Sequence, residues 1–142
     1  MTTEGRRRMY KIIIFTHDVL SRGLLETSRI VMGEQPDIET YSVTLGCDLE
    51  ELRACVKNSI EHSEREGQEV LVLTDLMYGT PFNMMAELQE THCFSHLTGV
   101  NLPMLLEAIN RRQEPLSEST NGELVKAAKN SIFDCRKFLG TI

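Results

Sequence analysis

The sequence predicts an α/β protein with a doubly wound, mainly parallel four-stranded sheet and helices on both faces. Apolar runs of strand length alternate along the 142 residues with stretches whose apolar residues recur every three or four positions. This alternation is typical of strands joined by right-handed helical crossovers. Residues 12–14 and 70–73 contain no polar side chain, as expected of central strands that are buried on both faces.

In the first half of the chain, two strands alternate with two helices. The first strand is wholly apolar, whereas the second alternates with polar residues and is therefore placed nearer the sheet edge. The first helix ends at Gly33, because glycine terminates helices readily. The second begins at Asp48, whose carboxylate can cap the free N–H groups of the first turn. These elements span residues 10–15, 21–32, 38–43 and about 48–65.

In the second half, two more strands are each followed by a helix, and a further helix comes last. The turn Gly79-Thr80 follows the third strand, and Pro81 suits the first helical position because its missing N–H would have no partner there. Asn101 either caps the next helix or lies on the rim of a site. A polar loop over residues 113–121 precedes the last helix. The elements span residues 70–74, 81–90, 97–100, 101–112 and 123–133.

The chain has the length of one ordinary domain, placed at residues 9–142. We expect residues 1–8, which carry three arginines, to form a disordered tail. The apolar run that follows has seven residues before His17, too few for a signal-peptide core or a membrane span. At the other end, residues 134–142 leave apolar side chains without a helix. We expect an antiparallel C-terminal strand, swapped between the subunits of a homodimer, that covers an exposed sheet edge.

The charge pattern indicates which kinds of partner to expect, and the cysteine spacing indicates which motifs and which compartment to expect. The net charge is −6 and both signs are interspersed, which argues against a nucleic acid or a membrane surface as the main partner. The four cysteines are widely spaced without a C-x-x-C pair, so neither a zinc knuckle nor a thioredoxin-type motif is predicted. We expect free thiols and a cytoplasmic location.

Two residues that can do proton or phosphoryl chemistry end the central strands. His17 follows the first strand and Asp75 follows the third. In doubly wound sheets the first and third strands commonly lie side by side, and ligands bind at their carboxyl ends. A carboxylate that accepts from one ring nitrogen fixes the tautomer and leaves a lone pair on the other. The sequence therefore predicts a nucleophilic histidine.

An anion site is expected beside this histidine. Gly79 and Thr80 open a helix, and free backbone N–H groups, a hydroxyl and the helix dipole suit a phosphoryl group there. Neither a Walker-type loop with lysine nor a carboxylate cluster for magnesium accompanies them, so the phosphoryl group is expected from a phosphorylated protein, with no cofactor and no metal. The group His92, Cys93 and His96 lacks a carboxylate or further cysteine that would complete a metal site, and we expect His62, His92 and His96 at the surface or at helix ends.

Four short motifs follow one another in the chain. They are Ile-Phe-Thr-His17-Asp, Gly33-Glu34-Gln35, Leu73-Thr74-Asp75 with Gly79-Thr80-Pro81-Phe82-Asn83, and Gly99-Val100-Asn101-Leu102-Pro103-Met104-Leu105. Over about residues 9 to 138 they resemble the enzyme IIA domain of the mannose family of the bacterial phosphoenolpyruvate-dependent sugar phosphotransferase system. The family usually has glycine where Asp18 stands.

The resemblance implies a homodimeric phosphoryl relay for sugar uptake. The histidine takes phosphate from the histidine-containing phosphocarrier protein and passes it to enzyme IIB, while the membrane is involved only through the permease subunits. On the matching motifs, His17 is the phosphorylated residue, Asp75 orients it and Thr80 hydrogen-bonds at the site. The transported sugar is not indicated. Met84, Met85 and Met104 fill the core or contribute to a docking surface.

Three alternatives remain open. The phosphotransfer subunit of dihydroxyacetone kinase shares the fold and the histidine, although serine usually precedes that histidine and Thr16 stands here. A response-regulator receiver resembles the stretch around Asp75, but it needs paired acidic residues after the first strand and a lysine after the fifth. A dimeric regulator without chemistry is the third alternative, and His17, Asp75 and Thr80 together argue against it.

Overall fold

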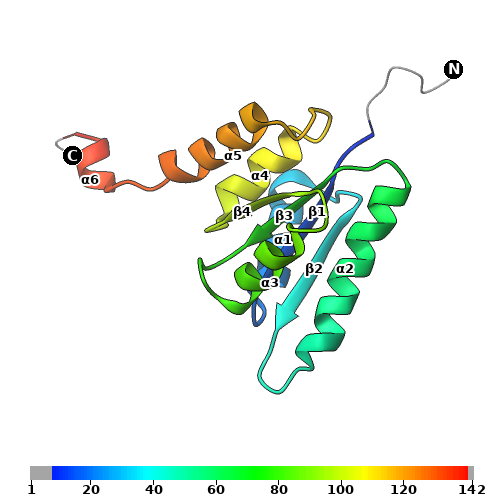
Figure 1. Cartoon of the computed structure of the whole chain (residues 1–142). Helices are drawn as coiled ribbons and strands as arrows, with labels where there is room; N and C mark the ends of the chain where they lie inside the picture. Colours follow the sequence, from blue (N-terminus) through cyan, green and yellow to red (C-terminus); the bar gives the residue numbers. More distant parts are fainter. Residues whose placement is uncertain (1–7, 141–142) are drawn as a thin grey trace, which may run out of the picture.

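A computed structural model describes residues 8–140 of the chain. Its four strands form one parallel sheet in the order β2-β1-β3-β4 (Figure 1). The strands are β1 (Lys11–His17), β2 (Ile38–Val43), β3 (Val70–Thr74) and β4 (Ser95–Thr98). The chain goes outward from β1 to β2 and then returns past β1 to β3, so the predicted doubly wound topology and the predicted contact between the first and third strands are confirmed.

Helices cover both faces of the sheet, as predicted (Figure 1). One face packs against α1 (Leu20–Met32), α4 (Leu102–Asn110) and α5 (Glu118–Asn130). The other packs against α2 (Leu49–Arg65) and α3 (Thr80–Leu88). A single helical turn, α6 (Cys135–Phe138), lies beyond α5 and away from the sheet.

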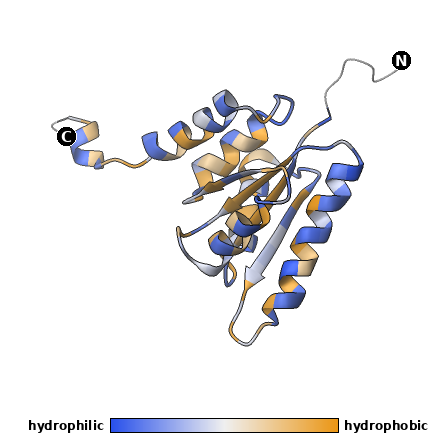
Figure 2. Ribbon diagram, viewed as in Figure 1, coloured by the Kyte–Doolittle hydropathy of each residue, from blue (hydrophilic) through white to orange (hydrophobic). Residues whose placement is uncertain are grey.

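The core consists of two apolar layers separated by the sheet. In β1, Ile12 and Ile14 face the layer of α4 and α5, while Ile13 and Phe15 face the layer of α2 and α3. Successive side chains of a strand point to opposite faces, so a strand between two helical layers has a nearly continuous run of apolar residues. Figure 2 shows the resulting contrast between the hydrophobic central strands and the mixed surface of α2. This burial on both faces fixes the strand ends that carry the candidate site.

Two predicted helix caps are present. The Asp48 carboxylate accepts from the backbone N–H groups of Glu50 and Glu51 at 3.0 and 3.1 Å. Asn101 accepts from the N–H of Met104 at 3.0 Å and donates to the carbonyl of Ala128 at 3.3 Å. Asn101 therefore starts α4 and ties it to α5, which settles its two predicted alternatives in favour of the cap.

Two boundaries in the second half differ from the prediction. Strand β4 begins at Ser95, two residues before the predicted start, because an edge strand admits polar side chains and pairs through its backbone alone. Helix α5 begins at Glu118, inside the stretch predicted as loop. The Ser117 hydroxyl accepts from the N–H of Thr120 at 3.2 Å and caps this helix. Polar residues around Gly122 hid the helix, since they carry no apolar periodicity.

The C-terminal segment contains the helix α6 in place of the predicted strand. The Asp134 carboxylate accepts from the N–H groups of Arg136 and Lys137 and so starts this turn of helix. The predicted exchange of an antiparallel strand is not confirmed. Of the predicted N-terminal tail, residues 1–7 lie outside the described residues, and Arg8 donates to the carbonyl of Glu66 at 3.3 Å.

Two predictions from composition can be compared with the structure. All four cysteines are free, as predicted. Within residues 8–140, no helix has both the length and the apolar character needed to cross a membrane.

Candidate active site

His17 and Asp75 lie side by side at the carboxyl edge of the sheet. Phe15 pairs with Thr74 across β1 and β3, so the residues that follow these positions meet where both strands end. One oxygen of Asp75, Oδ2, accepts from the backbone N–H of His17 at 2.9 Å and lies 3.0 Å from its Nδ1. The same oxygen therefore holds both the main chain and the ring of the histidine.

The two members of this pair differ in exposure. The His17 side chain is 44% exposed, whereas that of Asp75 is 12% exposed. Among the described residues, the other oxygen of Asp75, Oδ1, is buried without a hydrogen-bond partner. Because the carboxylate accepts, Nδ1 carries the proton and Nε2 keeps a lone pair. The result is a nucleophilic nitrogen at the surface, supported by a covered carboxylate.

Gly79 forms the wall against which the imidazole packs. A Cβ on Gly79 would lie 2.7 Å from Cε1 of His17 and 3.4 Å from Nε2. Because the φ of Gly79 is −77°, its backbone would admit any residue, and the requirement for glycine here is one of space. The predicted closeness of Gly79 to the histidine is thus present.

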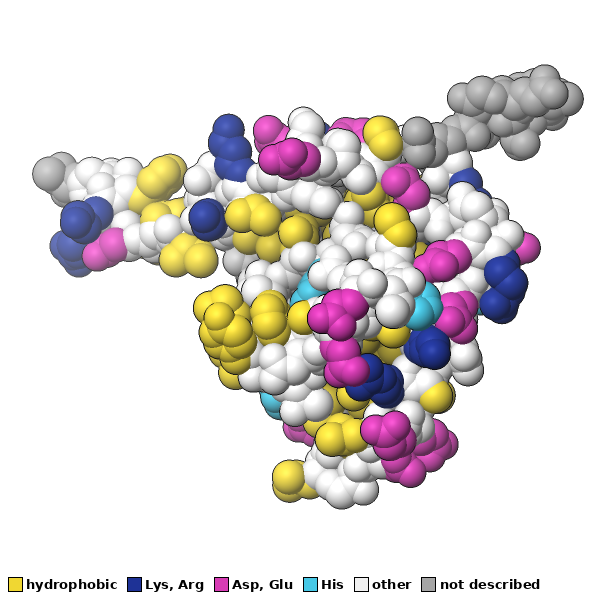
Figure 3. All heavy atoms as spheres, viewed as in Figure 1, with side chains coloured by type: hydrophobic (Ala, Val, Ile, Leu, Met, Phe, Trp, Pro, Cys, Tyr) yellow, Lys and Arg dark blue, Asp and Glu magenta, His cyan; other side chains and the backbone are white. Residues whose placement is uncertain are grey.

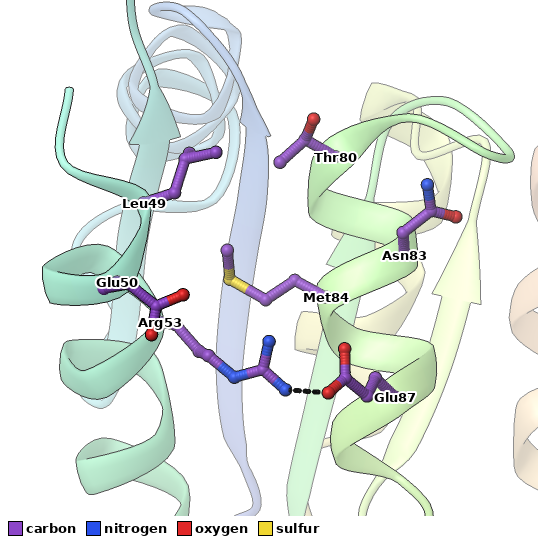
Figure 4. Close-up of a pocket in the computed structure, with 7 residues that line it drawn as sticks. All are labelled: Leu49, Glu50, Arg53, Thr80, Asn83, Met84 and Glu87. Atoms are coloured by element: carbon purple, nitrogen blue, oxygen red, sulfur yellow. Dashed lines mark ion pairs between the residues drawn. The ribbon is translucent and has the colours of Figure 1, made fainter. Parts of the chain in front are cut away.

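Helix α3 begins next to the imidazole. Gly79 is its N-cap and supplies no side-chain cap, so the N–H groups of the first turn have no side-chain acceptor and are available to an anion. The Thr80 side chain lies at one end of a groove between α2 and α3, which the ion pair between Arg53 and Glu87 crosses (Figure 4). Within residues 8–140, the Thr80 hydroxyl makes no hydrogen bond to His17 or Asp75.

The β1–α1 turn is fixed by two hydrogen bonds that backbone N–H groups donate. The buried Thr16 hydroxyl accepts from the N–H of Ser21 at 2.8 Å, and the N–H of Asp18 donates to the carbonyl of Val43 at 2.9 Å. Asp18 adopts a φ of 47°, and its side chain is exposed. The turn therefore joins the end of β1 both to the start of α1 and to β2.

Seven exposed apolar side chains, which we call the apolar rim, follow the carboxyl ends of the strands. They are Val19, Leu20, Leu45, Leu49, Leu76, Met77 and Tyr78. Tyr78 is held by the Asn83 amide, which donates to its carbonyl at 3.2 Å, and by an edge-on contact with the ring of Phe82. Sequence patterns did not reveal this rim, because its members lie in loops or at the first position of a helix, where apolar residues show no periodicity. The methionines considered for docking, Met84, Met85 and Met104, are buried in the core.

The other histidines do not form a metal site. His96 lies partly buried on β4, where Nε2 is 2.8 Å from the Thr74 hydroxyl, and burial lowers its pKa to about 4. His96 is therefore not the surface residue that we expected from the sequence. His92 pairs with Glu61 at 2.8 Å. Across the described part of the chain, no three His, Cys, Asp or Glu side chains gather into a group that could hold a metal ion.

A doubly wound sheet with a carboxylate-held histidine at its switch point is an arrangement suited to phosphoryl transfer. The sequence matches the EIIA-man family, described as the PTS system fructose IIA component, over residues 11–128. The chain therefore belongs to this family of the bacterial sugar phosphotransferase system (PTS), as the motifs indicated.

Three relatives illustrate the match. The chain is 27% identical to the PTS system fructose-specific EIIA component of Bacillus subtilis (strain 168) over 132 residues, covering 92% of this chain and 90% of that protein. It is 30% identical to the sorbose-specific EIIA component of Lacticaseibacillus casei over 110 residues, covering 76% and 78%. The crystal structure of the PTS IIA protein associated with the fucose utilization operon of Streptococcus pneumoniae matches with a TM-score of 0.83 at 27% identity, covering 95% and 99%.

Family membership gives the protein its general role. It is a phosphotransferase component that relays phosphoryl groups in sugar transport, between an upstream phosphocarrier and an EIIB partner. No finding favours the dihydroxyacetone kinase or receiver alternatives.

Substituting Gly79 tests the packing of the imidazole. In Gly79→Ala, the new methyl group would overlap Cε1, so the ring must turn away from Asp75. We expect the variant to fold but to accept phosphoryl groups at least about 10-fold more slowly, since positioning of the nucleophile is lost. Single-turnover labelling measures the rate, and Gly122→Ala, where a Cβ meets no atom within 4 Å, serves as control. A normal rate in Gly79→Ala would show that this contact does not position the ring.

Proposed function

We propose that His17 is the residue that carries the phosphoryl group, on Nε2. The lone pair of Nε2 forms a bond to the phosphorus of the phosphorylated donor, and the electron pair of the broken P–N bond returns to the donor nitrogen. Transfer onward reverses these roles, with a nucleophile of the acceptor taking the phosphorus and Nε2 recovering its pair. The carrying observation is the 3.0 Å contact of Nδ1 with Asp75 Oδ2, which leaves Nε2 as the free nitrogen.

Asp75 acts in this proposal as the positioning and charge-balancing residue. Its carboxylate keeps the proton on Nδ1 and stabilises the positive charge that the ring acquires when Nε2 is phosphorylated. The second hydrogen bond, from the backbone N–H of His17, limits the movement of the carboxylate relative to the ring. Both contacts support a role for Asp75 through His17.

Gly79 and Thr80 bind the phosphoryl oxygens in this proposal. Gly79 lies against the edge of the ring that carries Nε2, and the N–H groups that follow it point out of the start of α3. These groups, with the Thr80 hydroxyl, would donate hydrogen bonds to the phosphoryl oxygens and stabilise the negative charge on them.

The upstream partner in this proposal is the histidine-containing phosphocarrier protein, and the acceptor is enzyme IIB. The apolar rim follows the same edge of the sheet as His17, whose side chain is partly exposed, and exposed apolar patches mark protein docking sites. Four free thiols fit a cytoplasmic relay, since disulfides are rare in that compartment. The membrane takes part only through the permease subunits.

We also propose a homodimer formed through the C-terminal segment. Ile132, Phe133, Phe138 and Leu139 are between 50% and 75% exposed in the single chain, and Figure 3 shows hydrophobic side chains gathered on this projecting segment. The ring centroids of Phe133 and Phe138 lie 4.4 Å apart, so the two rings form one apolar surface. Strand β4 is an unpaired edge. A second copy of the chain would cover both this apolar surface and the edge of β4 with one self-complementary interface.

Phosphorylation of the intact protein tests the proposed acceptor. We expect one phosphoryl group after incubation with phosphoenolpyruvate, enzyme I and the phosphocarrier protein, visible as a mass increase. It should be labile in acid and stable in base, because a phosphoramidate is cleaved once its nitrogen is protonated. His17→Ala should gain no mass, whereas His62→Ala should behave as wild type. Label retained by His17→Ala would refute the assignment.

Replacing Asp75 tests the role of its charge. In Asp75→Asn, the amide oxygen can still accept from the backbone N–H, but the negative charge is lost. We expect a folded protein whose single-turnover phosphoryl transfer is slower by roughly 100-fold. Circular dichroism checks the fold. An unchanged rate of phosphoryl transfer would show that Asp75 has only a structural role after the end of β3.

The dimer proposal is tested by mass in solution. Light scattering at micromolar concentration should report about twice the chain mass. Deletion of residues 134–142, or the double change Phe133→Ser with Phe138→Ser, should give a monomer or an aggregate because the apolar contact is removed. A monomeric full-length chain, or a dimer that survives both changes, would contradict the proposal.

A further inference from the structure

The residue that follows the candidate nucleophile has an unusual backbone conformation and an exposed charge. Asp18 has a φ of 47°, in the left-handed region where glycine is unstrained and aspartate is tolerated at a cost. With His17, Val43, Thr44 and Leu45 it lines a depression of about 390 Å³. Asp18, whose side chain is exposed, therefore lines the same open depression as His17.

The fold makes little use of this carboxylate. Within residues 8–140, the Asp18 side chain forms no hydrogen bond and no ion pair, while its backbone N–H makes the contact with Val43. The N-cap of α1 is Val19, which supplies no side-chain cap, and in the first turn the N–H of Ser21 donates to the Thr16 hydroxyl. The remaining structural benefit is the favourable position of a negative charge near a helix start. Glycine would supply the turn without strain, so the carboxylate needs another explanation.

Carboxylates outnumber cationic side chains in the lining of the depression that contains Asp18 and of the groove beside Thr80. Among residues 8–140, no lysine or arginine lines the depression that contains Asp18. In the groove beside Thr80, the positive charge of Arg53 is paired with Glu87, and Glu50 adds a further carboxylate. A phosphoryl group brings between one and two negative charges of its own at neutral pH. A site that held this group permanently would surround it with free cations, whereas this site places another anion next to it.

We propose that Asp18 destabilises the phosphorylated state of His17 by charge repulsion, and so raises the tendency of the protein to pass the phosphoryl group on. This inference rests on the proposed phosphorylation of His17. Asp18 forms and breaks no bond in the transfer: the P–N bond to Nε2 breaks, the electron pair returns to Nε2, and the acceptor nucleophile bonds to phosphorus. Repulsion raises the free energy of the phosphorylated protein and leaves the unphosphorylated protein nearly unchanged.

The size of the effect follows from the exposure of both groups. Charges that face solvent a few ångströms apart interact by about one to two RT, which corresponds to a roughly 3- to 10-fold change in an equilibrium constant. Because salt screens exposed charges, this change must shrink as ionic strength rises. A steric or conformational effect of residue 18 would not depend on salt in this way.

The test is the equilibrium constant for phosphoryl transfer from the phosphorylated phosphocarrier protein to this chain, measured by intact mass in wild type, Asp18→Asn and Asp18→Gly. Both variants fit a positive φ and remove the charge. At low salt, about 20 mM, we expect both to raise the constant roughly 3- to 10-fold. At about 0.5 M salt the difference should fall to less than about 2-fold.

Asp37→Asn provides a matched control. Asp37 also has a positive φ, of 55°, and it precedes β2 at the opposite end of the sheet from His17. The change removes the same charge, and the new amide oxygen can still accept from Gln68, as the carboxylate does at 3.2 Å. The constant for this variant should equal that of wild type.

The outcomes separate the two proposals. A wild-type protein that takes no label on His17 overturns both the proposed function and the role of Asp18. Normal labelling with an unchanged constant in the Asp18 variants overturns the role of Asp18 alone. The same conclusion follows if the change persists at high salt, if Asn and Gly act in opposite directions, or if Asp37→Asn shifts the constant equally.

Discussion

The parallel pairing of β1 with β3 is the constraint on which the site depends. The register that places Phe15 opposite Thr74 brings His17 within hydrogen-bond distance of Asp75. A slip of two residues would move one strand by about 6.6 Å and separate the pair, while a slip of one would send every core side chain to the wrong face. Since residues 12–15 of β1 and 70–73 of β3 are apolar and buried between two helical layers, the energy of the core enforces the geometry of the site.

The site combines a rigid support with an accessible imidazole. Asp75 is nearly covered and its Oδ2 accepts twice, whereas His17 is almost half exposed. Gly79 closes one side of the ring without covering Nε2. A deeper histidine would be oriented equally well, but a macromolecular donor could not bring its phosphorus to it. The exposure of His17 therefore fits transfer between proteins better than chemistry on a small substrate held in a closed pocket.

The sequence predicted those features that local residue patterns determine, and missed those that depend on assembly. Apolar runs located the strands, and Asp48 and Asn101 marked helix starts because their side chains can cap only there. The position of His17 next to Asp75 followed from a topological rule. His96 was misjudged because its burial comes from contact with Thr74 and the ring of Phe82, which lie elsewhere in the chain. The C-terminal segment was read as a strand, since its short capped turn has no helical repeat.

The apolar rim bears on how one histidine could serve two partners. Nε2 is the ring nitrogen that Asp75 does not hold, so a donor and an acceptor that use it must approach in turn over the same surface. Leu76, Met77 and Tyr78 offer contacts that are non-directional, and methionine adapts to different shapes. Such a surface does not by itself distinguish the two partners. If His17 carries the phosphoryl group, the direction of transfer is then set by the relative stability of the phosphorylated proteins, and the charges beside Nε2 are the part of this chain that can adjust it.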